Sequence, residues 1–253
     1  MPSMVYSFQF VAIWFLSLLS SCRAFAPSAS SFITTGTRSL LVAKEATHGT
    51  DRTMTKTRLI ANKMCPFAQK AWIALETSKT PFEMQEISLY GANGKPDWFW
   101  ELNPQGTVPV VVYGNGETVL PDSDLILDQI DQISAAAVET TAPLCPSNLK
   151  SDISDWRQRI NDMLPVGKQS VFANKPSSKL KQQLKAMNDA VKGSYLTGQT
   201  VTVADCHAFP FLWRLNTEFP LEKEYPQLAE WIQTCSNLPS FRITIQSSWW
   251  WWW

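Results

Sequence analysis

The sequence Cys65-Pro66-Phe67-Ala68 is the feature that most limits how this chain can fold. It lies between an apolar stretch, Arg58 to Asn62, and an amphipathic stretch, Gln69 to Ser78. Proline holds a helical φ and lacks an N–H, so it favours the first position of a helix. The pattern therefore predicts a strand followed by a helix, with Cys65 at the helix start.

A cysteine at a helix start is a candidate nucleophile. The free N–H groups and the positive end of the helix stabilise a thiolate, so we expect the pKa of Cys65 to lie below the ordinary value of a cysteine. The alternative is a buried cysteine that packs as a small apolar side chain.

The other metal-ligating residue types do not cluster. The five cysteines stand at positions 22, 65, 145, 206 and 235, without a C-x-x-C pair, so neither a disulfide framework nor a zinc site is expected. Of the two histidines, His48 lies in a polar segment, and His207 lies among apolar residues and is predicted to be a core histidine. The sequence thus predicts no metal.

Composition restricts the class of protein. The chain has 253 residues, of which 45% are hydrophobic and 17% charged, which is typical of a globular protein with an ample core. Its formal net charge is zero, and Lys and Arg form no run. A nucleic-acid partner is therefore not expected.

The first 44 residues contain no Asp or Glu. Their apolar core, Phe10 to Leu19, is shorter than the roughly 20 residues needed to span a bilayer, and small residues follow it up to Ala24. We predict a signal peptide over residues 1–24 and a Ser/Thr-rich transit peptide or disordered segment over residues 25–55. With Phe25 at the junction, this arrangement resembles the bipartite plastid presequences of diatoms and related algae. The alternative is plain entry into the secretory pathway, followed by a linker.

The rest of the chain divides into two parts. Residues 56–138 alternate strand and helix, whereas residues 139–246 contain four helical stretches and no convincing strand. We expect strands over 57–61, 82–89, 108–113 and 117–120, and helices over 66–78, 96–102, 122–133, 148–164, 177–191, 203–215 and 227–236. Thr202 and Asp205 have the spacing of a capping box. Residues 247–253 form a Trp-rich tail to which we assign no function, although such a tail also suits a membrane interface or a partner's groove.

Four short segments occur in one order along the chain, and together they form a specific pattern: Cys65-Pro66-Phe67, Lys95 to Phe99, Asn103 to Val110, and Asp122-Ser123-Asp124. This set resembles the cysteine-type glutathione transferases, which include the omega, lambda and dehydroascorbate reductase classes. The resemblance covers nearly all of Thr57 to Ile245. One departure is Lys70, where relatives usually carry arginine.

The resemblance implies an α/β thioredoxin-like N-terminal domain, an all-helical C-terminal domain and glutathione as co-substrate. It further implies that Cys65 is the catalytic residue. The implied glutathione-binding residues are Phe67, Lys95, Val108, Pro109, Asp122 and Ser123. Pro109 would form the cis peptide bond of the fold, Ser123 would bind the γ-glutamyl carboxylate, and Lys95 the glycyl carboxylate. Taken singly, Lys95 could instead be a solvated lysine, Ser123 an N-cap and Pro109 an edge-strand proline.

The implied activity is a thiol transferase or dehydroascorbate reductase in the plastid, acting through a mixed disulfide between Cys65 and glutathione. A lambda-like deglutathionylation of small adducts and a non-catalytic ligand carrier or scaffold remain as alternatives. The second substrate would be a small oxidised or glutathionylated molecule, and the candidates for its pocket are Trp156, Arg157, Ile160 and Trp213. We expect no membrane association once the presequence is removed, and either a monomer or a homodimer.

Overall fold

The computed structural model describes residues 57–89, 94–114, 116–137 and 142–246. These residues all belong to one compact unit, residues 51–253. The predicted signal peptide, the transit segment and the Trp-rich tail lie outside the described residues. So does the boundary predicted between the two domains, because it falls within residues 138–141.

The described residues contain one mixed sheet, with the strand order β2-β1-β3-β4. Its strands are β1 (Thr57–Ala61), β2 (Phe82–Glu86), β3 (Val110–Tyr113) and β4 (Thr118–Leu120). β1 runs parallel to β2 and antiparallel to β3, and β3 pairs with β4 as a hairpin. Because parallel neighbours need a crossover, helix α1 (Pro66–Thr77) connects β1 to β2.

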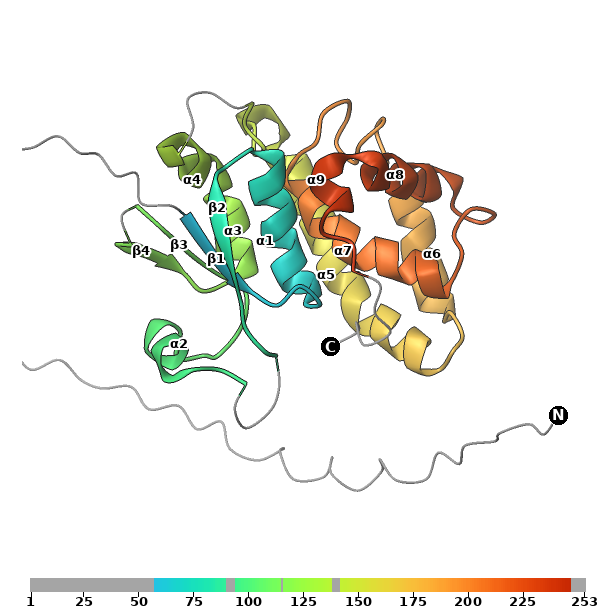
Figure 1. Cartoon of the computed structure of the whole chain (residues 1–253). Helices are drawn as coiled ribbons and strands as arrows, with labels where there is room; N and C mark the ends of the chain where they lie inside the picture. Colours follow the sequence, from blue (N-terminus) through green and yellow to red (C-terminus); the bar gives the residue numbers. More distant parts are fainter. Residues whose placement is uncertain (1–56, 90–93, 115, 138–141, 247–253) are drawn as a thin grey trace, which may run out of the picture. The chain divides into compact units, whose positions relative to one another are not determined.

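Alternating side chains of the sheet enter two apolar clusters. Leu59 and Val111 point into the larger core, which also contains residues of α1. Ile60 and Val110 point to the other face, where Phe99 of α2 (Asp97–Leu102) covers them. The strand period of two therefore gives the sheet two buried faces. Figure 1 shows α1 between the sheet and α7.

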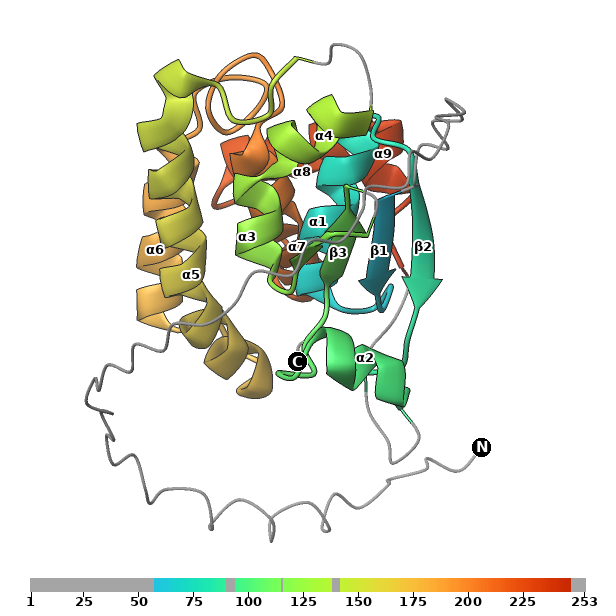
Figure 2. The same ribbon diagram turned by 90° about the vertical axis from the view of Figure 1, so that its left-hand side faces the viewer.

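Helices form the second half of the chain. They are η1 (Ser147–Leu149), α5 (Lys150–Phe172), α6 (Ser178–Asn188), α7 (Val203–Glu218), α8 (Pro226–Asn237) and α9 (Pro239–Arg242). Figure 2 shows α5 and α6 side by side, and α7 packs against both α5 and α1. The two-part fold expected from the sequence, a sheet with helices followed by helices alone, is confirmed.

Several element boundaries differ from the predictions. The helix expected over 122–133 is two helices, α3 (Ser123–Asp128) and α4 (Ile130–Ala137), separated at Gln129. β2 ends at Glu86 because its partner β1 ends opposite that residue, at Ala61. α5 continues past Pro165 to Phe172, since Val166 and Ser170 are buried beyond the proline and their packing offsets the missing hydrogen bond.

The predicted start of α7 is confirmed. Thr202 is its N-cap, and the capping box with Asp205 is present. The carboxylate of Asp205 also accepts hydrogen bonds from the backbone N–H of Leu196 at 2.9 Å and from Nε1 of Trp231 at 2.9 Å. One buried side chain therefore joins the start of α7 to the preceding loop and to α8.

Candidate active site

Cys65 lies at the N-cap of α1, directly before Pro66 at the first helical position. An Asn62 turn leads into it: the side chain of Asn62 accepts from the backbone N–H of Met64 at 3.0 Å and donates to the carbonyl of Ile87 at 2.9 Å. The end of β1 is thereby held to the chain beyond β2. This local geometry turns the chain from strand to helix at the residue that the sequence singles out.

The thiol of Cys65 is close to β3. Its Sγ lies 3.9 Å from the carbonyl oxygen of Val108, and the Val108–Pro109 peptide bond is cis. The residue is 9% exposed. The fold therefore brings Cys65 and Val108 together, across 43 residues of sequence.

The expectation of a lowered pKa at Cys65 was wrong. Burial raises the pKa of the Cys65 thiol above its ordinary value. The backbone N–H groups of Ala68 and Phe67 and the positive charges of Arg214 and Lys70 act in the opposite direction, but they do not outweigh the loss of solvation. The helix start stabilises a thiolate as predicted, but the packing above it favours the neutral thiol.

Ser123 and Asp122 stand at the start of α3. Ser123 is the first helical residue and is 4% exposed. Oδ1 of Asp122 accepts hydrogen bonds from the backbone N–H groups of Asp124 at 2.7 Å and Leu125 at 3.1 Å. Asp122 is thus an N-cap, and none of the residues that the structure places hydrogen-bonds its second carboxylate oxygen.

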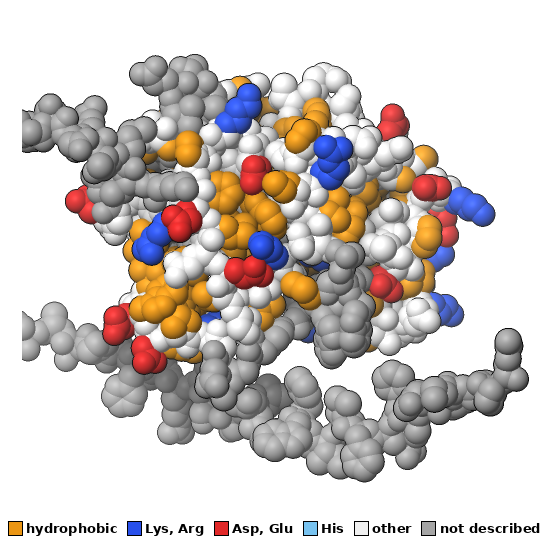
Figure 3. All heavy atoms as spheres, in the orientation of Figure 1, with side chains coloured by type: hydrophobic (Ala, Val, Ile, Leu, Met, Phe, Trp, Pro, Cys, Tyr) orange, Lys and Arg blue, Asp and Glu red, His pale blue; other side chains and the backbone are white. Residues whose placement is uncertain are grey.

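Lys95 stands near the short helix α2. Its Nζ donates to the carbonyl of Leu89 at 2.9 Å and lies 6.0 Å from the ring centroid of Trp100. Gly106 adopts a φ of +66°, and a Cβ at this position would lie 2.3 Å from the Trp100 ring. Hydrophobic side chains gather over α2 in Figure 3. Trp98 and Trp100 of α2 are both exposed large hydrophobic residues.

Phe67 lies in the first turn of α1, and its ring faces the helical part of the chain. It makes an edge contact with Phe211 of α7, with 5.3 Å between the ring centroids. Nζ of Lys70 lies 5.2 Å from the centroid of the same ring. Phe67 therefore joins the start of α1 to α7.

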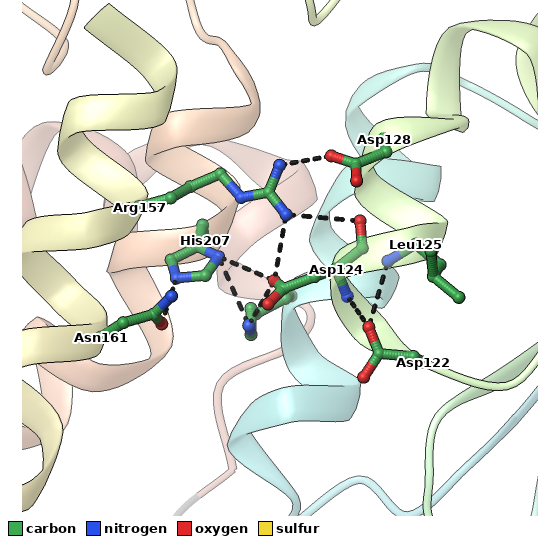
Figure 4. A network of polar contacts seen from close by, with 8 residues as sticks. Asp122, Asp124, Leu125, Asp128, Arg157, Asn161 and His207 are labelled. Atoms are coloured by element: carbon green, nitrogen blue, oxygen red, sulfur yellow. Dashed lines mark hydrogen bonds and ion pairs between the residues drawn. The ribbon is translucent and has the colours of Figure 1, made fainter. Parts of the chain in front are cut away.

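A polar network, buried at Lys70 and His207, lies beside this contact, and sequence reasoning did not predict it (Figure 4). Lys70 is 1% exposed and donates to Oδ1 of Asp124 at 2.9 Å. Nδ1 of His207 is 3.2 Å from the same oxygen, and its Nε2 is 3.3 Å from Oδ1 of Asn161. Arg157 contacts both Asp124 and Asp128. The network joins α1, α3, α5 and α7.

Burial and charge act against each other in this network. Burial lowers the pKa of His207 to about 4, although Asp124 raises it. Burial also lowers the pKa of Lys70, against the attraction of Asp124. Burial raises the pKa of Asp124, but the hydrogen bond from His207 and the charge of Lys70 outweigh it and hold that pKa well below its usual range. His207 is therefore a core histidine with polar partners, as the sequence predicts.

The four residues expected to form a second pocket have different surroundings. Trp156 and Ile160 are 3% and 0% exposed, and the indole of Trp156 donates to the carbonyl of Leu196 at 3.2 Å. Both pack into the helical core, because α5 turns that face toward its neighbours. Arg157 belongs to the polar network described above. Trp213 lines a surface hollow of about 480 Å³ between α7 and α8.

No group of three or more His, Cys, Asp or Glu side chains suited to a metal ion occurs in the described part of the chain. Four cysteines there, Cys65, Cys145, Cys206 and Cys235, are free thiols. Helices long and apolar enough to cross a bilayer are also absent from the residues that the structure places.

Comparison with known proteins gives concordant matches. Residues 64–133 match the family model "Glutathione S-transferase, N-terminal domain", and residues 163–239 match "Glutathione S-transferase, C-terminal domain". The chain is 31% identical over 155 residues to "Probable glutathione S-transferase DHAR1, cytosolic" of Oryza sativa subsp. japonica, covering 60% of this chain and 67% of the relative. It is 26% identical over 154 residues to "Glutathione S-transferase DHAR3, chloroplastic" of Arabidopsis thaliana, covering 60% of this chain and 55% of that relative.

Solved structures are similar in fold. Glutathione transferase Omega 3C of Trametes versicolor has a TM-score of 0.66 at 20% sequence identity, covering 76% of this chain and 85% of that chain. The similarity extends over both the sheet-containing and the helical part.

Proposed function

The chain belongs to the glutathione transferase family, and we propose that it is a glutathione-dependent thiol transferase that reduces dehydroascorbate through a mixed disulfide on Cys65. The observation that carries this proposal is the position of the Cys65 thiol, at the N-terminus of α1 and 3.9 Å from the Val108 carbonyl. The residue as a whole keeps an exposure of 9%. The similarity to relatives with dehydroascorbate reductase names supports the choice of substrate.

The proposed reaction has two steps. With a glutathionylated substrate, the Cys65 thiolate attacks the glutathionyl sulfur, so that a Cys65–glutathione disulfide forms and the substrate thiolate leaves. With dehydroascorbate, the Cys65 thiolate and one glutathione thiol together supply two electrons and one proton, which gives the ascorbate anion and the same mixed disulfide. A second glutathione thiolate then attacks that disulfide, releases oxidised glutathione and restores the Cys65 thiolate.

The residues around Cys65 suit glutathione. We propose that the backbone of Val108, beside the cis Pro109, binds the cysteinyl unit. The N-terminus of α3 at Ser123 binds the γ-glutamyl carboxylate, and the free oxygen of Asp122 binds the amino group. Lys95 binds the glycyl carboxylate, and Phe67 forms a wall beside the sulfur. Cysteine in place of a hydroxyl residue favours disulfide chemistry over conjugation, because a thiolate bonds covalently to an oxidised sulfur.

A coupled glutathione-oxidation assay tests this function. The purified protein is supplied with glutathione and either dehydroascorbate or a small mixed disulfide. Wild type and Cys145→Ser should turn over both, and Cys65→Ser should be inactive while it keeps its fold. Cys145 is the matched control because it is a partly exposed free thiol next to α4, where its backbone N–H donates to Asp131. Glutathione binding without turnover would show a ligand carrier instead, and turnover of glutathionylated adducts alone would show a lambda-like deglutathionylase.

We also propose a plastid location, which rests on the Phe25 junction, on the acid-free segment that precedes Glu45, and on the chloroplastic names of some relatives. Residues 1–55 fused to a fluorescent reporter should direct it to the plastid of a diatom. Replacement of Phe25 by Ala should hold the reporter in the endomembrane system. Secretion of the reporter with Phe25 intact contradicts this location and leaves the proposed activity untouched.

A further inference from the structure

Arg214 of α7 is a buried cation. It is 2% exposed, and Nη1 donates to the side-chain oxygen of Gln69 and to the carbonyl of Pro210, the latter at 2.7 Å. Its Nε has no hydrogen-bond partner. Among the residues that the structure describes, Arg214 forms no ion pair with a carboxylate.

Such an environment is costly for a charge. A buried guanidinium normally has a carboxylate partner, because the loss of hydration is otherwise repaid only in part by neutral hydrogen bonds. The other buried cation of this region, Lys70, has such a partner in Asp124. Arg214 therefore lies where a negative charge would be strongly stabilised.

The contacts of Gln69 place this cation at the first turn of α1. The backbone N–H of Gln69 donates to the carbonyl of Cys65 at 2.9 Å, so Gln69 lies one helical turn beyond the thiol. Its side-chain NH₂ donates to the hydroxyl and the carbonyl of Thr244, at 3.0 and 3.2 Å. The amide oxygen is thereby turned toward Arg214. Thr244 and Gln69 together hold the guanidinium beside the start of the helix.

The charges that act on Cys65 can be named. Arg214 and Lys70 lower the pKa of the thiol, against the larger effect of burial, and the backbone N–H groups of Ala68 and Phe67 assist them. In return, a negative charge on Cys65 raises the pKa of Arg214, but burial outweighs it and lowers that pKa to about 10. Lys70 is largely compensated by Asp124, so Arg214 is the cation that responds to Cys65.

We propose that Arg214 is a positioning residue whose guanidinium serves as the counter-charge of the Cys65 thiolate. This inference rests on the proposed role of Cys65 as nucleophile. The thiolate exists before Cys65 attacks, and it forms again when glutathione attacks the mixed disulfide and Cys65 leaves with the electron pair of the broken S–S bond. Arg214 stabilises the thiolate at both moments, and a stabilised thiolate leaves faster.

The test is the pH dependence of Cys65 alkylation by iodoacetamide in the full chain without glutathione, followed on the Cys65 peptide by mass spectrometry. Arg214→Met removes the charge and keeps the length of the side chain. It should raise the apparent pKa of Cys65 by about one unit or more, which slows alkylation at neutral pH roughly ten-fold. Arg214→Lys retains a cation and should recover most of the rate.

A structural role gives a different result. Phe209→Leu is the control, because it weakens the packing of the fully buried Phe209 in the same helix without changing any charge. It should lower the unfolding midpoint and leave the pH profile unchanged. If Arg214→Met behaves like this control, the proposal is wrong. If Arg214→Met does not fold, Gln69→Leu, which frees the guanidinium from α1, should raise the same pKa, and an unchanged profile there overturns the proposal.

The alkylation experiment does not depend on turnover. If the wild type fails the coupled assay but the pKa of Cys65 differs between Arg214→Met and Arg214→Lys, the proposed function is wrong and the proposed role of Arg214 is supported. If the wild type turns over substrate but the pKa of Cys65 is the same in these variants, the proposed function is supported and the proposed role of Arg214 is wrong.

Discussion

Replacement of Asp205 by alanine should strongly destabilise the protein. Asp205 is 0% exposed, and its two carboxylate oxygens accept four hydrogen bonds. Three of the donors are N–H groups, on the backbone of Leu196, the backbone of Thr202 and the indole of Trp231. The fourth, the hydroxyl of Thr202, can turn to Thr197 at 3.1 Å.

The magnitude follows from these donors. A buried N–H group left without an acceptor costs about 1–3 kcal/mol. Three such groups sum to about 3–9 kcal/mol, and small shifts of the loop at Leu196 reduce this, so we expect a loss of about 4–6 kcal/mol. Asp205→Asn keeps one acceptor oxygen and should lose roughly half as much. A loss of this size is a large part of the ordinary stability of a folded domain.

Urea unfolding measures the effect. Far-UV circular dichroism reports the helices, and tryptophan fluorescence reports the surroundings of Trp231. Asp189→Ala is the matched control, because Asp189 is an exposed acid whose pair with Lys185 lies on the surface. It should change the unfolding free energy by no more than about 0.5 kcal/mol. A loss under about 1 kcal/mol for Asp205→Ala would falsify the view that this carboxylate holds the start of α7 to its neighbours.

Three further predictions concern pH, glutathione and the α2 region. Burial lowers the pKa of His207 from 6.5 to about 4, so the folded protein binds fewer protons than the unfolded chain between these values. The contribution of His207 to the free energy of unfolding is therefore fully present above pH 6.5 and falls by up to about 3 kcal/mol toward pH 4. Urea unfolding of His207→Gln should show a free energy of unfolding that depends less on pH over this range. Ser123→Ala and Lys95→Ala should each weaken glutathione binding roughly ten-fold, since a charge-assisted hydrogen bond contributes about 1.5–3 kcal/mol, and calorimetry that gives wild-type affinity for both contradicts the proposed binding site. Gly106→Ala should displace Trp100 and lower the melting temperature, while Gly116→Ala, where a Cβ meets nothing within 4 Å, isolates the cost of a positive φ.

Local features of this protein could be predicted because they depend on residues a few positions apart. The strand-to-helix change at Cys65 follows from an apolar run, a proline and an amphipathic stretch. The start of α7 follows from the spacing of Thr202 and Asp205. The ordered motifs indicated the family, and apolar neighbours in the sequence correctly indicated that His207 is buried.

Other features depend on elements that are distant in the sequence. Helix α5 passes through Pro165 because the residues beyond it are buried by neighbouring helices, and no local signal reports that burial. For the same reason Trp156 and Ile160, which suit a pocket by their residue types, pack into the core. Their roles depend on which face of α5 the rest of the fold covers.

The electrostatics of the site show the difference between local and distant effects most clearly. The residues of the first turn of α1 indicate a stabilised thiolate, and the N–H groups of that turn do lower the pKa of Cys65. Burial reverses the net direction of the shift in the Cys65 pKa, and burial depends on how the rest of the chain packs around the sulfur. Arg214, one of the two cations that oppose the effect of burial on Cys65, contacts Gln69 across 145 residues of sequence. Desolvation and charge act through space. Local patterns in the chain therefore single out Cys65 as a candidate, whereas the pKa of its thiol and its charged partners depend on how the sheet and the helical part pack together.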